Sequence, residues 1–174
     1  MHLFGDSSDG RLVDFADGSA GVLVASGNEG ATKETRADRV NLYLSRDAGL
    51  SWKKILAGPQ RSAFGNYGGL LVAVSSSSAS KVISYSWNLG DDWVSCEAFA
   101  EVMDIEQIVP VGGSGGLTFL VIGSVDVAGT NQGKIVLLDF SSSGTRSCRF
   151  YSQIHCSVLT LCRRWTELPR RGKQ

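Results

Sequence analysis

Two short segments of this chain place a hydroxyl, a carboxyl or amide oxygen, a glycine and a tryptophan at the same spacing. Ser45–Trp52 and Ser86–Trp93 both read S-x-[DN]-x-G-x-x-W, and their first residues are 41 positions apart. A carboxylate in such a motif could transfer a proton, or it could accept hydrogen bonds from the backbone of a turn. The second copy has Asn88 where the first has Asp47, and an amide neither ionises nor transfers a proton. We therefore predict that Asp47 and Asn88 fasten turns.

The other positions of the motif have structural explanations of the same kind. Gly49 and Gly90 can take the positive φ that closes a tight turn without a steric clash at Cβ. Trp52 and Trp93 open the next apolar run, where a large ring can pack across the base of a hairpin. The pattern is known as an Asp box. We predict a structural role, not a catalytic one, for its defining residues: Ser45, Asp47, Gly49, Trp52, Ser86, Asn88, Gly90 and Trp93.

Apolar runs of strand length flank both boxes, so each box is predicted to form the turn of a β-hairpin. The four flanking runs are Val40–Leu44, Trp52–Leu56, Lys81–Tyr85 and Trp93–Phe99. Four further runs have the same character: Gly21–Gly27, Gly68–Val74, Leu117–Gly123 and Lys134–Phe140. Gly-, Ser- or Asn-containing loops separate them, namely Ser75–Ser80, Gly112–Gly116 and Ala128–Gly133. The chain is therefore predicted to be all-β, with about two to three four-stranded blades of a β-propeller.

A propeller of this length cannot close on itself. At roughly 40 residues per blade, the 174 residues are too few for even a four-bladed ring. An open arc exposes faces and edge strands that missing blades would cover, which favours self-association. We therefore expect a fragment of a larger propeller over residues 1–147, followed by a basic, cysteine-containing tail over residues 148–174.

Composition and charge exclude several other classes. The chain is 43% hydrophobic, with 21 Gly but only 3 Pro, as expected for a protein with many turns. Its formal net charge is zero, although residues 146–174 carry a net +6 and residues 1–145 a net −6. Apart from Trp165, the tail arginines lack interleaved aromatic residues, so we expect no nucleic-acid partner. No apolar run is long enough to span a bilayer and no signal peptide is recognisable, so the segment as written is expected to be soluble.

Several segments occur in the order seen in sortilin-type vacuolar sorting receptors, which contain a Vps-ten domain. Four elements resemble that domain in succession: the strand Gly21–Gly30, the run Asn41–Trp52 with its box, the stretch from Gly58 to Val74, and the second box within Val82–Trp93. The resemblance covers about residues 20–148. It implies the last blades of a ten-bladed propeller in the lumenal part of a type I membrane receptor. Such receptors bind protein cargo in the Golgi or endosome and deliver it to the vacuole or lysosome.

The resemblance ends near Cys148, where the family continues into a module with regularly spaced cysteines. Here a basic tail with Cys156 and Cys162 follows instead, so the tail is a translated intron, a mis-assembled exon or a genuine divergent terminus. A lumenal location would permit a disulfide at Cys96 or Cys148, with partners partly outside this sequence. The resemblance also implies that the parent protein resides in the Golgi or endosomal membrane and contacts it only through segments absent from this sequence.

The resemblance identifies no cargo-contacting residue in this sequence. Ligands of the family bind inside the propeller tunnel, which is lined by the innermost strand of each blade. Gly21–Gly27 and Gly68–Val74 are our candidates for innermost strands.

Sialidases and other propeller glycosidases also carry Asp boxes, so a hydrolase is the alternative interpretation, and a generic protein-binding propeller is another. Hydrolysis of a sialoside needs arginines on the substrate carboxylate and a tyrosine activated by a glutamate. The chain has these residue types, but no spacing selects a triad among Glu29, Glu34, Glu97, Glu101, Glu106, Tyr43, Tyr67, Tyr85 and Arg61. We therefore predict that the chain is not an enzyme.

No cofactor or metal is predicted. Gly112–Gly116 is glycine-rich, but it lacks the Lys-Ser/Thr of a phosphate-binding loop and leads into a strand, not a helix. The four cysteines lack the C-x-x-C spacing of a zinc site, and His155 beside Cys156 is not a ligand pair by itself.

Overall fold

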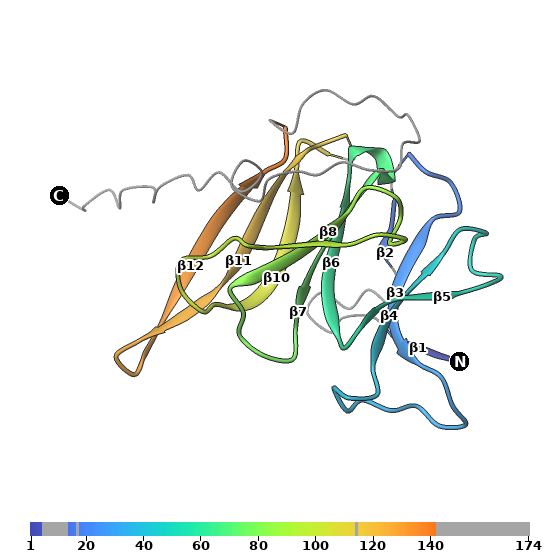
Figure 1. Ribbon diagram of the computed structural model, residues 1–174, viewed down its shortest axis with the longest axis horizontal. Coiled ribbons are helices and arrows are strands. Elements are labelled where there is room, and N and C mark those ends of the chain that lie inside the picture. The colour runs from blue at the N-terminus through green and yellow to red at the C-terminus, as the bar shows by residue number, and fades with distance from the viewer. Residues whose placement is uncertain (5–13, 17, 114, 142–174) are drawn as a thin grey trace.

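The computed structural model describes residues 1–4, 14–16, 18–113 and 115–141. Within these residues twelve β-strands form three antiparallel sheets, and the one helical element is a short 3-10 turn, η1 (Asn66–Gly68). Figure 1 shows the sheets fanned out in chain order, from blue through green to orange. The predicted all-β, partial-propeller architecture is confirmed, with three sheets as its blades.

The first sheet pairs β3 (Leu23–Asn28), β4 (Asn41–Ser45) and β5 (Lys53–Ala57) in chain order. Two short strands, β1 (His2–Phe4) and β2 (Asp14–Phe15), pair one after the other with the free edge of β3. Together β1 and β2 occupy the position of one first strand, so the sheet has the outline of a four-stranded blade.

The second sheet is four-stranded and the third is three-stranded within the described residues. The second consists of β6 (Gln60–Gly65), β7 (Leu70–Ser75), β8 (Val82–Ser86) and β9 (Val94–Glu97). The third consists of β10 (Asp104–Val111), β11 (Thr118–Val127) and β12 (Thr130–Asp139). Residues 142–174, and with them Cys148 and the predicted basic tail, lie outside the described residues.

The second sheet lies between the other two and is buried on both faces. On β7, Leu70 and Val72 belong to the apolar core shared with the third sheet, whereas Leu71 and Ala73 belong to the core shared with the first sheet. Successive side chains of a strand point to opposite faces, so a strand between two cores must be apolar at every position. The continuous run Leu70–Val74 meets this requirement.

The β11–β12 hairpin corrects one predicted loop. Ala128 and Gly129 alone connect the two strands, with φ of 52° and 80°. Two residues with positive φ fit the tight turn that matches strand twist, and the Asp126 side chain accepts a hydrogen bond from the Gly129 N–H at 2.7 Å. Thr130–Gly133, predicted as loop, therefore belongs to β12.

Sequence patterning missed the first strand of every sheet: β1, β2, β6 and β10. All four lie at a sheet edge. β1 and β2 have only 3 and 2 residues, and β6 and β10 mix polar with apolar residues, so none of them shows the apolar run that reveals the inner strands. In β10 a bulge between Ile105 and Gln107 also interrupts the two-residue alternation.

The prediction of the innermost strands is wrong because the first strand of each sheet had been missed. Gly21–Gly27 and Gly68–Val74 correspond to β3 and β7, which are the second strands of their sheets and are hydrogen-bonded on both sides. The first strands, β6 and β10, lie against each other, and the Arg61 Nε donates a hydrogen bond to the Ile105 carbonyl at 2.7 Å. The second and third sheets therefore converge at their first strands.

Candidate functional site

The first box closes the β4–β5 hairpin through two side chains. The Ser45 Oγ donates to the Asp47 Oδ1 at 2.8 Å and accepts a hydrogen bond from the Gly49 N–H at 2.8 Å. The Asp47 carboxylate accepts two bonds from Ser51, one from its N–H at 2.8 Å and one from its hydroxyl at 2.5 Å. Ala48 and Gly49 have φ of 57° and 92°, so these bonds hold two residues in the left-handed region.

The second box repeats the arrangement in the β8–β9 hairpin. The Ser86 Oγ donates to the Asn88 Oδ1 at 2.9 Å and accepts from the Gly90 N–H at 2.8 Å. The Asn88 Oδ1 accepts from the Asp92 N–H at 2.9 Å. The side-chain hydrogen bond runs in the opposite direction to that of the first box: the Asn88 amide donates to the Asp92 carboxylate at 2.8 Å.

The two tryptophans differ in their polar contacts. In the first box the Trp52 indole N–H donates to the Gly49 carbonyl at 3.0 Å. In the second box the Trp93 indole N–H is buried and has no hydrogen-bond partner among the described residues. Trp93 instead packs against the apolar core between the first and second sheets.

The electrostatics of Asp47 do not suit proton transfer at neutral pH. Hydrogen bonds from the Ser51 hydroxyl and backbone, and then from the Ser45 hydroxyl, lower the pKa of Asp47 to about 2. A general acid needs a pKa near the working pH, so Asp47 remains an anion that only accepts hydrogen bonds. The geometry is what a turn fastener requires, and its role remains a prediction to be tested by substitution.

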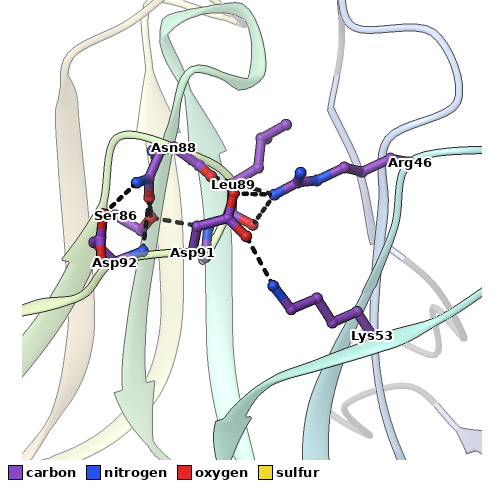
Figure 2. A network of polar contacts seen from close by, with 8 residues as sticks. Arg46, Lys53, Ser86, Asn88, Leu89, Asp91 and Asp92 are labelled. Carbon is purple, nitrogen blue, oxygen red and sulfur yellow. Dashed lines mark hydrogen bonds and ion pairs between the residues drawn. The ribbon is translucent and has the colours of Figure 1, made fainter. Parts of the chain in front are cut away.

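A cluster of charges joins the two boxes and was not predicted from the sequence (Figure 2). The Arg46 guanidinium, from the first box, donates to the Asp91 carboxylate at 2.8 Å and to the carbonyls of Asn88 and Leu89 at 3.4 and 3.3 Å. The Lys53 ammonium donates to the same Asp91 carboxylate at 2.9 Å. We call Arg46, Lys53 and Asp91 the inter-box clasp.

The clasp lowers the pKa of Asp91, mainly through its hydrogen bonds to Arg46 and then to Lys53. All three side chains are partly exposed, and exposed ion pairs contribute roughly 0–1 kcal/mol. Apolar packing beside the clasp is therefore the larger stabilising contribution. Opposite charges on successive boxes were the available sequence signal for this contact.

The backbone of the second box presses directly against the first sheet. A Cβ on Gly90 would lie 2.9 Å from the Cβ of Ile55, a buried residue of β5. Leu89 packs into the same core between the two sheets. The glycine is therefore needed both for its φ of 80° and for the close approach of the two sheets.

The residues of the hydrolase alternative do not form a common site. Tyr43 and Tyr85 are buried at 1% and 2% exposure, and Tyr85 belongs to the core with the third sheet. Tyr67 is exposed in η1, and Glu101 forms an ion pair with Lys134. Glu29 and Glu34 lie in the loop after β3 and Glu97 lies in β9, whereas Arg61 of β6 and Glu106 of β10 lie on two strands that contact each other.

The described part of the chain has neither a metal-binding cluster nor a membrane-spanning helix. There, no three His, Cys, Asp or Glu side chains gather as a metal site, and no helix is long and apolar enough to cross a membrane. Cys96 is buried in β9. The predictions for Cys148, His155, Cys156 and Cys162 fall outside the described residues.

Three antiparallel sheets in chain order, with Asp boxes in the third-to-fourth-strand hairpins of two of them, define a section of an Asp-box β-propeller. The family model described as sortilin, neurotensin receptor 3, matches residues 1–108. The chain belongs to this Sortilin-Vps10 family.

Curated relatives agree with the family assignment. Vacuolar protein sorting/targeting protein 10 of Schizosaccharomyces japonicus is 35% identical over 84% of this chain, and that of Zygosaccharomyces rouxii is 30% identical over 85%. An uncharacterized membrane glycoprotein of Saccharomyces cerevisiae is 28% identical over 86% of the chain. The matched regions cover 9%, 9% and 14% of these relatives, so the chain spans only a small part of their length.

Proposed function

We propose that this chain is part of the lumenal propeller of a sorting receptor that binds protein cargo in the Golgi or endosome for transport to the vacuole or lysosome. The observation that carries the proposal is the match of the Sortilin-Vps10 family to residues 1–108, which contain both boxes and the whole inter-box clasp. Relatives named for vacuolar sorting, and a relative named as a membrane glycoprotein, support the same role.

Within that receptor the boxes would form part of the scaffold, and the first strands would contact the cargo. The boxes hold the outer hairpins of neighbouring sheets together, which fixes the angle between the sheets. With the sheets fixed, the edge strands β6 and β10 lie against each other, and both carry polar residues. Cargo contact is assigned to this edge.

The proposal gives the chain no enzymatic role, and it places the parent protein in the Golgi or endosomal membrane with this propeller on the lumenal side. The low pKa of Asp47 and the scattered positions of the hydrolase candidates support a binding function. Membrane contact is assigned to segments outside this sequence.

An isolated 174-residue chain is proposed to self-associate through its third sheet. β12 is an edge strand among the described residues, and Ile135 on it is 67% exposed. Open sheet edges with exposed apolar side chains pair readily with other chains. A monomer by sedimentation at micromolar concentration would contradict this part of the proposal.

Disruption of the gene in its native cells tests the sorting function. We expect soluble vacuolar or lysosomal hydrolases to appear in the medium, because their receptor is lost, while a secreted bulk-flow marker is unchanged. An antibody against residues 40–93 should detect the protein in detergent-extracted membranes of the parental cells. Normal retention of the hydrolases, with the membrane band lost on disruption, would reject hydrolase sorting and leave a membrane propeller with another cargo.

A further inference from the structure

Three loops, each joining the first strand of a sheet to the second, meet at one end of the sheets, the upper end in Figure 1. They follow β2, β6 and β10 and comprise residues 16–22, 66–69 and 112–117. Hydrogen bonds connect the middle loop to both others. The Ser19 hydroxyl donates to the Tyr67 carbonyl at 2.5 Å, and the Asn66 N–H donates to the Gly116 carbonyl at 3.0 Å. We call these three loops the rim.

Tyr67, in the middle loop of the rim, has a backbone conformation that large residues rarely adopt. Its φ and ψ are 53° and 35°, and Asn66 before it and Gly68 after it also have positive φ. The left-handed region is unfavourable for any residue with a Cβ, and a bulky residue there is an outlier. Burial does not offset this cost, because Tyr67 is 61% exposed. Strained residues of this kind are concentrated at functional sites.

Glycines of the two outer loops leave room for the Tyr67 ring. A Cβ on Gly18 would lie 2.9 Å from the Cδ1 of the ring, and a Cβ on Gly115 would lie 2.8 Å from its Cζ and its hydroxyl oxygen. The ring therefore lies between the backbones of these loops, with more than half of the residue open to solvent. A larger residue at either glycine would displace it.

The composition of the rim suits an uncharged partner. Apart from Tyr67, its described residues are uncharged and mostly Gly, Ser, Ala or Asn, and Asp17, the one charged residue in these stretches of sequence, lies outside the described residues. A tyrosine among Gly, Ser and Asn is typical of antibody paratopes, where the ring supplies contact area at low entropic cost and the small residues adapt to the partner. Two of the loops directly follow β6 and β10, so the rim continues the edge to which cargo contact is assigned.

We propose that Tyr67 is a binding platform on which an uncharged segment of the protein cargo stacks a flat ring, aromatic or proline. The fixed backbone holds the tyrosine ring in the open, and its exposed surface offers the apolar contact that such a ring seeks. A charged segment is disfavoured, because no described rim residue could form an ion pair with it. The identity of the partner rests on the proposed cargo binding, but the test requires no known cargo.

The stability of Tyr67→Gly separates a binding role from a packing role. In the full chain this substitution relieves the left-handed backbone, so the unfolding equilibrium constant should stay unchanged or fall by up to about fivefold. Ala128→Gly is the matched control, because Ala128 is exposed and has a φ of 52° but carries no ring. Its constant should fall roughly two- to fivefold. A rise of more than about tenfold for Tyr67→Gly alone would show that the ring is needed for packing and would overturn the platform.

Fluorine NMR of the full chain labelled with fluorotyrosine tests the ring directly. The resonance that Tyr67→Phe removes belongs to Tyr67, and the probes are capped pentapeptides with Trp, Pro, Leu or Lys at the centre of four glycines. We expect the Trp and Pro probes to shift this resonance more than the Leu and Lys probes do, while the resonances of the buried Tyr43 and Tyr85 stay in place. No shift, an equal shift with Leu, or the largest shift with Lys would overturn the assignment. Normal hydrolase retention after gene disruption would reject hydrolase sorting and leave the peptide result standing.

Discussion

The two Asp boxes hold their turns with the same hydrogen-bond geometry, but the hydrogen bond between their third and seventh side chains runs in opposite directions. In the first box an anionic Asp47 accepts a hydrogen bond from the Ser51 hydroxyl, and in the second a neutral Asn88 donates one to the Asp92 carboxylate. Each pair still contains one donor and one acceptor, and each box keeps the backbone N–H bound to its third residue. The comparison indicates that the requirement is a matched pair at the third and seventh positions, not a carboxylate at a fixed site.

The neighbourhoods of the two boxes differ more than their turns do. The second box packs on the first sheet through Gly90 and Leu89, whereas the corresponding side of the first box leaves Leu50 exposed. Equivalent substitutions in the two boxes therefore separate the cost of opening a turn from the cost of separating two sheets.

Among the side chains of the boxes, the largest effect is expected at the tryptophans. Trp52→Ala should destabilise the fold by about 3 kcal/mol, at the lower end of the range for deleting a large aromatic ring because Trp52 is only half-buried. Its indole also loses the hydrogen bond to the Gly49 carbonyl. Chemical denaturation followed by circular dichroism measures the change. A loss below about 0.5 kcal/mol, typical of an exposed surface residue, would contradict the fastening role.

Substitution of the box glycines isolates the contact between sheets. Gly49→Ala should cost about 1–2 kcal/mol for an Ala with positive φ, since its new Cβ meets only ordinary contacts at 3.6 Å or more. Gly90→Ala should cost about 1–3 kcal/mol more, because its Cβ collides with Ile55. Gly133→Ala, where nothing lies within 4 Å, is the neutral control. Equal losses at Gly49 and Gly90 would show that the sheets adjust freely.

Comparison of Trp52→Phe with Trp93→Phe sharpens the difference between the boxes. The first substitution removes a hydrogen bond and should cost about 1 kcal/mol beyond the lost ring area. The second removes a buried N–H that has no partner in the part of the chain that the structure describes, so this additional cost should be absent. Denaturation midpoints of the two variants measure the difference, and an equal cost would indicate that Trp93 binds an ordered water.

The smallest effect at neutral pH is expected for Asp47→Asn. The amide keeps an oxygen for the Ser51 N–H and can donate to the Ser51 hydroxyl, as Asn88 does to Asp92. The pH dependence should change, because the folded pKa of Asp47 is about 2 and its ordinary value is 3.8. Its contribution to stability is present above about pH 4 and is lost as the pH falls through 2, so the variant should show a flatter acid limb.

The boxes and most inner strands could be predicted from the sequence because residues close together in the chain determine both. The box residues from Ser45 to Trp52 form a turn whose bonds lie within four residues of each other, and β7 is revealed by an unbroken apolar run. The first strands β6 and β10 were missed because they carry polar residues such as Arg61 and Glu106, and the partner of each is a strand of the neighbouring sheet about 40 residues away in the sequence. Local pattern carries no information on such distant partners.

The inter-box clasp was also missed because local sequence patterns do not reveal contacts between distant residues. Arg46 and Asp91 are 45 residues apart, and each is of a residue type that is common in exposed turns. Alignment of the two boxes would have placed opposite charges at the second and sixth positions, yet only the fan of the sheets brings them together. Whether the side chain at the third position donates or accepts its hydrogen bond likewise depends on the seventh residue, which the motif leaves unspecified.

The stability of Asn88→Asp, alone and combined with Asp92→Ser, tests the central claim most directly. The single substitution places two carboxylates where the amide and carboxylate lie 2.8 Å apart, so we expect a loss of about 1–3 kcal/mol at pH 7. The folded variant then binds a proton more tightly than its unfolded chain, so the loss should shrink as the pH falls toward about 4. The double variant recreates the pairing of Asp47 with Ser51 and should recover most of the wild-type stability at pH 7. A double variant no more stable than the single one would contradict the claim that the boxes require a matched donor and acceptor.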